Sequence, residues 1–127
     1  MRKLVPFLAL ALLVGLVACG GGGSTSTGGD AQAGEQIFTG EASPSCSSCH
    51  SLEPDVTIVG PSLAGIASVA GQMVSGQSAE EYLHESIVDP DAYVVEGFPS
   101  GLMPSNYGTQ LSEQQINDLV AYLMTLN

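Results

Sequence analysis

The clearest pattern of apolar positions lies near the end of the 127-residue chain. Apolar side chains recur there at the three- and four-residue spacing that marks one face of a helix. The positions are Ile116, Leu119, Val120 and Leu123. Ser112 stands just before this run and Gln115 follows it three residues later, which is the spacing of a capping box. The pattern therefore predicts a helix that begins after Ser112.

Three shorter helices are predicted earlier in the chain from their start and stop signals. Asp30 is a good N-cap residue for a first helix, and Ser62 for a second. A third begins after Ser78, which has the capping-box partner Glu81. It ends before Pro90, because proline cannot donate the next helical hydrogen bond.

The remaining segments predict loops and no strand. No stretch alternates convincingly between apolar and polar residues. Residues 89–108 are dense in Gly and Pro and are assigned to a loop. Loops of about twenty residues in a domain of fewer than about 100 argue against a self-sufficient core. We therefore expect an all-α domain at residues 30–127, with four short helices and long loops around a large apolar cofactor.

Residues 1–29 are predicted to lie outside this domain. Residues 1–18 combine a basic start with an apolar run shorter than the roughly 20 residues of a membrane span, as in a secretory signal peptide. The segment Leu16-Val17-Ala18-Cys19 resembles the lipobox of bacterial lipoproteins, which implies cleavage before Cys19 and a lipid on its thiol. Residues 19–29 are rich in Gly, Ser and Thr, as in a flexible tether. We expect the protein at the outer face of the cytoplasmic membrane, or in the periplasm, held by the lipid.

The charge of the mature chain has one sign. Arg2 and Lys3 are the two basic residues, and both belong to the signal peptide, against thirteen Asp and Glu. Such a chain does not bind nucleic acid, and anionic lipid headgroups repel it, so the lipid anchor has to hold it at the membrane. The acidic surface is explained either by solubility or by redox partner proteins with a basic docking face.

The segment Cys46-Ser47-Ser48-Cys49-His50 carries the strongest chemical signal. A zinc site needs about four ligands, and only these two cysteines, His50 and His84 are available as thiols or imidazoles in the domain. A redox disulfide of the thioredoxin type needs a βαβ context, and no strand is predicted. Covalent haem attachment fits each detail, because the two thiols can add to the two vinyl groups of one porphyrin and His50 then lies under the iron.

The sixth position of the iron distinguishes an electron carrier from a haem that binds gas or peroxide. The candidates are His84, Met73, Met103 and Met124. Met103 is favoured, because it lies in the loop region and Pro104 after it stiffens the chain. With no Lys or Arg in the domain, the haem propionates are predicted to meet Tyr93, Asn106 or Tyr107.

The domain resembles the class I c-type cytochromes over residues 30–127. Beside the cysteine motif, the segment Gly60-Pro61-Ser62-Leu63 resembles the family segment in which a proline carbonyl accepts a hydrogen bond from the proximal histidine. Residues 102–108 resemble the distal methionine loop. The resemblance implies His50 and Met103 as iron ligands, thioether links at Cys46 and Cys49, and a contact of Pro61 with His50.

Two further similarities refine this expectation. Gly34 and Phe38 resemble the pair that crosses the last helix, where Leu119 and Tyr122 are the partners. Residues 80–104 resemble the haem c modules of membrane respiratory complexes, among them the cytochrome domain of some haem–copper oxidases and the monohaem lipoprotein subunit of alternative complex III. The spacer between Phe38 and Cys46 is longer than in the compact members.

The resemblance implies a function without substrate chemistry. We expect a membrane-tethered cytochrome with one covalent haem c that carries single electrons in a respiratory or photosynthetic chain, and not an enzyme. The first alternative is a fixed haem c subunit of a larger respiratory complex. The second is an open-site haem that binds gas or peroxide.

Overall fold

The computed structural model describes residues 28–127. The predicted signal peptide, Cys19 and most of the predicted tether lie outside the described residues. Within residues 28–127 the chain is helical, and its only β-type pairing is an isolated bridge between His50 and Thr57. In chain order the α-helices are α1 (Ala31–Gln36), α2 (Ile66–Val69), α3 (Ala79–Val88), α4 (Tyr107–Gln110) and α5 (Glu113–Leu123). The prediction of an all-α fold is confirmed.

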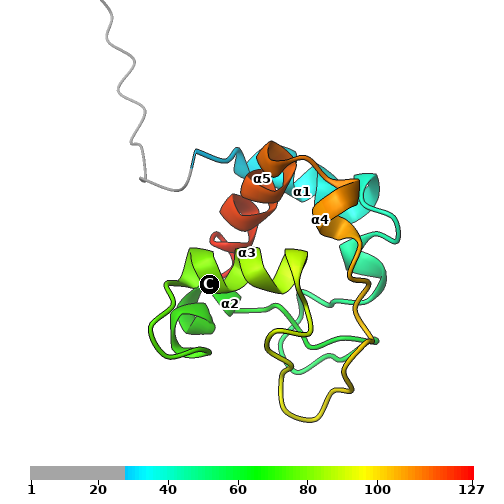
Figure 1. The fold of residues 1–127 in the computed structure, drawn as a ribbon. Coiled ribbons are helices and arrows are strands. Elements are labelled where there is room, and N and C mark those ends of the chain that lie inside the picture. Colours follow the sequence, from blue (N-terminus) through cyan, green and yellow to red (C-terminus); the bar gives the residue numbers. More distant parts are fainter. Residues whose placement is uncertain (1–27) are drawn as a thin grey trace, which may run out of the picture.

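Helices α1, α4 and α5 lie together at one end of the molecule, with α3 and then α2 below them, and long loops form much of the other end (Figure 1). Helix α5 packs against both α1 and α3. Gly34 of α1 lies so close to the carbonyl group of Asp118 that a Cβ there would overlap it. The rings of Phe38 and Tyr122 pack with their centroids 5.5 Å apart. The first and last helices therefore cross as the sequence predicted, with a glycine at the closest approach and aromatic rings beside it.

The predicted caps of three helices are present. The Asp30 carboxylate accepts hydrogen bonds from two backbone N–H groups at the start of α1. Ser78 and Glu81 form a reciprocal capping box at α3, and Ser112 and Gln115 form another at α5. These bonds satisfy donors that a helix start otherwise leaves unpaired, so local sequence defines where both long helices begin.

Ser62 is not a helix cap, and this prediction was wrong. Helix α2 begins at Ile66, after Gly65 in the left-handed region at a φ of 70°. The Ser62 hydroxyl instead donates to the carbonyl of Glu53 at 2.7 Å and accepts from the N–H of Ala64 at 3.2 Å. It ties two loop segments together, which a local helix-start signal cannot reveal.

Helix α4 was not predicted, because it begins at Tyr107, inside the stretch assigned to a loop. The Gln110 side chain pairs with both backbone groups of Ser43: its Oε1 accepts from the N–H at 2.9 Å, and its Nε2 donates to the carbonyl at 2.7 Å. The Tyr107 hydroxyl donates to the carbonyl of Pro44 at 2.7 Å. The long spacer in front of Cys46 is thereby held against α4.

The hydrophobic core lies where α1, α3 and α5 meet, and it continues into the wall of a cavity. Phe38, Ile37, Ile116, Leu119 and Val120 are its largest fully buried side chains. Phe38 and Leu119 also line the cavity, so the same packing that joins the helices shapes the site. Among residues 28–127, no helix has the length and apolar character to cross a membrane.

Candidate functional site

A cavity of about 310 Å³ opens between the helices and the long loops. Its walls are mainly apolar, and the volume falls in the ordinary range for bound cofactors and ligands. The helices and the segment before α2 contribute apolar side chains to these walls. Among them are Phe38, Leu63, Ile66, Leu83 and Ile87. The segment from Pro90 to Pro104 forms much of the remaining wall.

The cysteine motif is folded into a tight turn at the cavity. Residues Cys46–Ser48 form one turn of 3₁₀ helix, and the Cys46 carbonyl accepts hydrogen bonds from the N–H groups of Cys49 at 3.1 Å and His50 at 2.9 Å. This turn brings both thiols and the imidazole to the same cavity. Burial is the main reason that the pKa of Cys46 is raised to about 11. Both cysteines are free, so the turn offers two thiols and no disulfide.

The His50 ring is held in one orientation by the backbone that follows it. Its Nδ1 lies 2.8 Å from the carbonyl oxygen of Pro61, so this nitrogen carries the proton that the carbonyl accepts. The Cys49 carbonyl accepts hydrogen bonds from the N–H groups of Val59 and Gly60, which fixes the returning chain beside the ring. The other ring nitrogen, Nε2, is left as the one with a lone pair for a metal.

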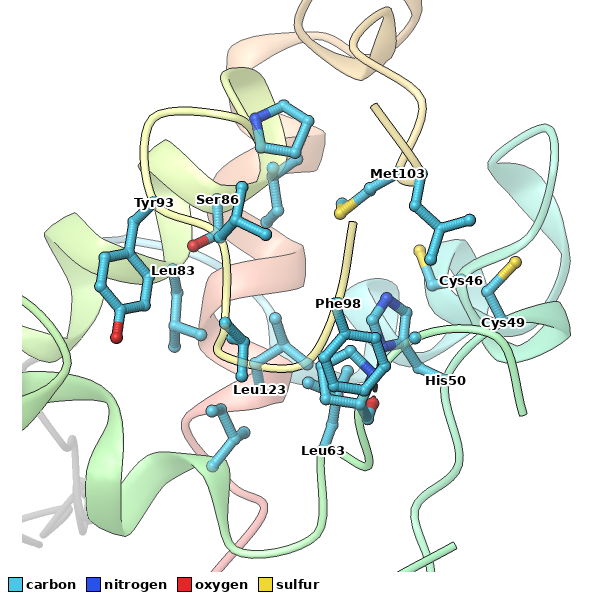
Figure 2. Close-up of a pocket in the computed structure, with 18 of the residues that line it drawn as sticks. Cys46, Cys49, His50, Leu63, Leu83, Ser86, Tyr93, Phe98, Met103 and Leu123 are labelled. Carbon is cyan, nitrogen blue, oxygen red and sulfur yellow. Dashed lines mark hydrogen bonds between the residues drawn. The ribbon is translucent and has the colours of Figure 1, made fainter. Parts of the chain in front are cut away.

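Met103 lies across the cavity from His50, with Cys46 and Cys49 beside them (Figure 2). Of the other candidate ligands, Met73 also lines the cavity. Met124 does not line it, and packs against the core.

His84 lies away from this cavity, on the surface between α3 and α5. Its Nε2 is 3.1 Å from a carboxylate oxygen of Glu113. His84 is therefore not placed to bind a group in the cavity, and the side chains on opposite sides of that apolar space are the Met103 thioether and the His50 imidazole.

The three residues predicted to contact the propionates differ in their access to the cavity. Tyr93 lines the cavity, is partly exposed, and packs edge-on against Tyr82 with ring centroids 5.8 Å apart. Tyr107 also lines the cavity, but its hydroxyl proton is already donated to Pro44. Asn106 is exposed and is not among the lining residues. Tyr93 is therefore the one of the three with both access to the cavity and an uncommitted hydroxyl among the described hydrogen bonds.

Sequence reasoning missed two residues of the cavity wall that shape the site. Phe98 extends over the space beside His50 (Figure 2). Asp91 is the one carboxylate among the lining residues, and its Oδ1 accepts a hydrogen bond from the N–H of Gly101 at 2.8 Å. An aspartate near the start of a Gly- and Pro-rich loop was the available signal, because aspartate side chains commonly bond loop backbone.

The side chains available as ligands distinguish among the three uses of a C-x-x-C pair, which are a zinc site, a redox disulfide and covalent haem attachment. Within residues 28–127, no group of three or more Cys, His, Asp and Glu is arranged to hold a metal ion, which leaves zinc without a ligand set. The same part of the chain has no βαβ unit for a thioredoxin-like site.

The residues present do fit haem. Two adjacent thiols and an oriented imidazole lie at an apolar cavity, with a thioether across it. The fold and the site define a c-type haem protein.

Comparison with known families agrees with this class. The sequence model of the family Cytochrome c matches residues 31–127, which is most of the chain, and the protein belongs to this family. Membership confirms the resemblance to class I c-type cytochromes, and it means that the chain carries one covalently attached haem c and serves as a haem-based electron carrier. A cytochrome c domain is not typically an enzyme. No curated protein matches the chain.

Proposed function

We propose that this protein is a membrane-tethered monohaem cytochrome c that carries single electrons in a respiratory or photosynthetic chain, with His50 and Met103 as the axial ligands. The observation that carries this proposal is the placement of His50 and Met103 on opposite sides of one cavity whose edge holds both cysteines. When bound, the haem supplies an iron that alternates between the ferric and ferrous states.

The chain's own groups have distinct parts in this function. Cys46 and Cys49 are the thioether attachment points, and the Pro61 carbonyl orients His50 and makes its Nε2 a better donor. The Met103 sulfur is a soft ligand that favours the ferrous state. Apolar walls such as Leu83 exclude water, which favours the less charged ferrous centre. His50 and Met103 would hold the group from its two sides, so these residues would need little rearrangement when the oxidation state changes.

The acidic chain opposes these effects on the reduction potential. Every charged side chain among residues 28–127, His aside, is Asp or Glu, and one of them, Asp91, lines the cavity. Negative charge stabilises the ferric state by roughly a few tenths of a kcal/mol per exposed carboxylate. We therefore propose a positive but moderate potential.

The spectrum of the purified haem protein tests the axial ligands. We expect the weak near-infrared sulfur-to-iron band in the ferric form, and no binding of carbon monoxide to the ferrous form. A reduced protein that binds carbon monoxide readily, without that band in the oxidised form, would instead indicate the open-site haem that binds gas or peroxide.

The proposed location rests on the N-terminal sequence. A lipid on Cys19 and a tether over residues 19–29 would hold the domain at the outer face of the cytoplasmic membrane, or in the periplasm, with reach on the order of 20 Å. The lipoprotein interpretation predicts that the protein fractionates with membranes and takes up a labelled fatty acid in cells, and that Cys19→Ala takes up none. Labelling of that variant to the parent level would contradict a lipid on Cys19.

The proposed partners are redox proteins of the same membrane chain, with a basic docking face. The support is the charge of the domain, which has no Lys or Arg. Raising the salt concentration should then slow electron transfer steeply. A flat salt response would leave the acidic surface as a means of solubility.

A fixed subunit of a larger respiratory complex is the second candidate, favoured by the resemblance of residues 80–104 to such modules. Gel filtration of detergent extracts with haem staining separates the two. A shuttle elutes at the size of the single chain in its micelle, whereas a subunit co-elutes with a much larger assembly.

A further inference from the structure

The segment that carries Met103 has few hydrogen bonds of its own. Between Tyr93 and Ser105, the described backbone–backbone bonds outside helices include one within the segment, from the N–H of Phe98 to the carbonyl of Val95 at 3.1 Å. Apolar contact with the cavity supplies the rest of its support. A chain with so few internal bonds needs attachment at its two ends to hold one side chain in a fixed place.

One end of this segment is attached to α3 through Asp91. The Asp89 N–H donates to the Glu85 carbonyl at 2.7 Å, and the Ala92 N–H donates to the Asp89 carbonyl at 3.0 Å, so Asp91 stands on a turn continuous with the helix. From there its Oδ1 accepts the 2.8 Å hydrogen bond of the Gly101 N–H, ten residues further along the chain.

Gly101 and Met103 are close enough in the chain for this bond to matter at the sulfur. Only Leu102 stands between them, and Gly101 has a φ of 74°, a left-handed conformation that glycine adopts without strain. On the other side of Met103, α4 is held by the hydrogen bond of Tyr107 to Pro44. The chain that carries Met103 is therefore attached at two points, one on the turn after α3 and one on the segment before Cys46.

We propose that Asp91 is a positioning residue for Met103: by holding the Gly101 N–H it closes the base of the loop and keeps the methionine sulfur over the haem. The inference rests on the proposed function, because it takes Met103 as the axial ligand. The hydrogen bond matters here, and the negative charge does not, so an uncharged acceptor of the same shape should replace it.

The test measures how often the sulfur leaves the ferric iron. Imidazole added in excess binds only when Met103 has moved away, so its binding rate reports loop opening. We expect Asp91→Ala to raise that rate about fivefold, the factor that corresponds to about 1 kcal/mol for one hydrogen bond, and to weaken the sulfur-to-iron band. Asp91→Asn retains a carbonyl oxygen at the same position, and we expect it to restore the rate to near the parent value.

Glu96→Ala is the matched control, because Glu96 lies in the same loop, is exposed, and makes no hydrogen bond among those described. It should bind imidazole at the parent rate. The proposal is overturned if Asp91→Ala also binds at the parent rate while the parent protein shows its sulfur-to-iron band. It is equally overturned if Asp91→Asn or Glu96→Ala is as fast as Asp91→Ala. A parent protein that lacks the band overturns the proposed function itself.

Discussion

Gly60 lies in van der Waals contact with the His50 ring, and the space between them admits no side chain. A Cβ on Gly60 would stand 2.6 Å from Cε1 of the imidazole, closer than real Cβ atoms approach other atoms. The ring is thus confined between this backbone and the hydrogen bond of its Nδ1 to Pro61. The glycine in this segment is needed for the close approach of chain and imidazole, and not for a left-handed backbone.

The first prediction follows from that contact. Gly60→Ala forces the ring or the returning chain to shift, and overpacking of this kind costs about 1–3 kcal/mol. We expect a lower yield of haem-loaded protein and a lower urea midpoint. Gly40→Ala is the control, because a Cβ on Gly40 meets nothing within 4 Å. Equal stability of the two variants would show that the ring moves freely.

The second prediction separates the two methionines at the cavity. Met103→Leu should abolish the sulfur-to-iron band, allow carbon monoxide to bind the ferrous form, and lower the reduction potential. Each tenfold loss of preference for the ferrous state lowers it by about 59 mV. Met73→Leu removes a thioether from the same cavity and should leave the band in place. Loss of the band in Met73→Leu alone would reassign the ligand.

The third prediction concerns the pairing of Gln110 with Ser43. Gln110→Ala removes both hydrogen bonds between α4 and the segment before the cysteines, and each such bond contributes roughly 0.5–1.5 kcal/mol. Because Gln110 and Ser43 are both exposed, we expect each bond to contribute near the lower end of this range. The free energy of unfolding, measured with urea, should then fall by about 1 kcal/mol in total. Gln32→Ala is the matched change at an exposed glutamine whose side chain makes none of the described hydrogen bonds. A Gln110 variant as stable as the Gln32 variant would contradict the role given to this pair.

The fourth prediction concerns Tyr107 and alkaline pH. Burial is the main reason that the pKa of Tyr107 is raised above its ordinary value, which for tyrosine is about 10. The folded state therefore favours the neutral phenol, and this contribution is complete below about pH 10 and is lost as pH rises through the higher folded value.

Tyr107→Phe should accordingly be less stable than the parent near pH 7, by about 1 kcal/mol for the lost hydrogen bond to Pro44. The variant has no phenol to ionise at this position, so the difference should shrink as pH rises from 9 toward 11 or above. Urea unfolding of the parent and the variant at several pH values measures the difference in stability and its change with pH. A difference that stays constant with pH would show that the Tyr107 hydroxyl does not titrate differently in the folded state.

Much of this protein was determined by short stretches of its sequence. The capping boxes at Ser78 and Ser112 involve residues three apart, so propensity and spacing were enough to predict them. The two cysteines and His50 are equally close in sequence, so their motif was enough to predict that they share one site. The apolar stripe of the last helix predicted its buried face for the same reason.

The tertiary structure alone decided the contacts between residues far apart in the chain. Gln110 meets Ser43 across 67 positions, and Ser62 reaches Glu53 across a loop instead of capping a helix. The bond of Asp91 to Gly101 closes a loop that the sequence showed only as rich in glycine and proline. Side chains of these types bond whichever backbone group lies within reach. The path of the whole chain around the cavity determines which backbone group lies within reach, and no local pattern encodes that path.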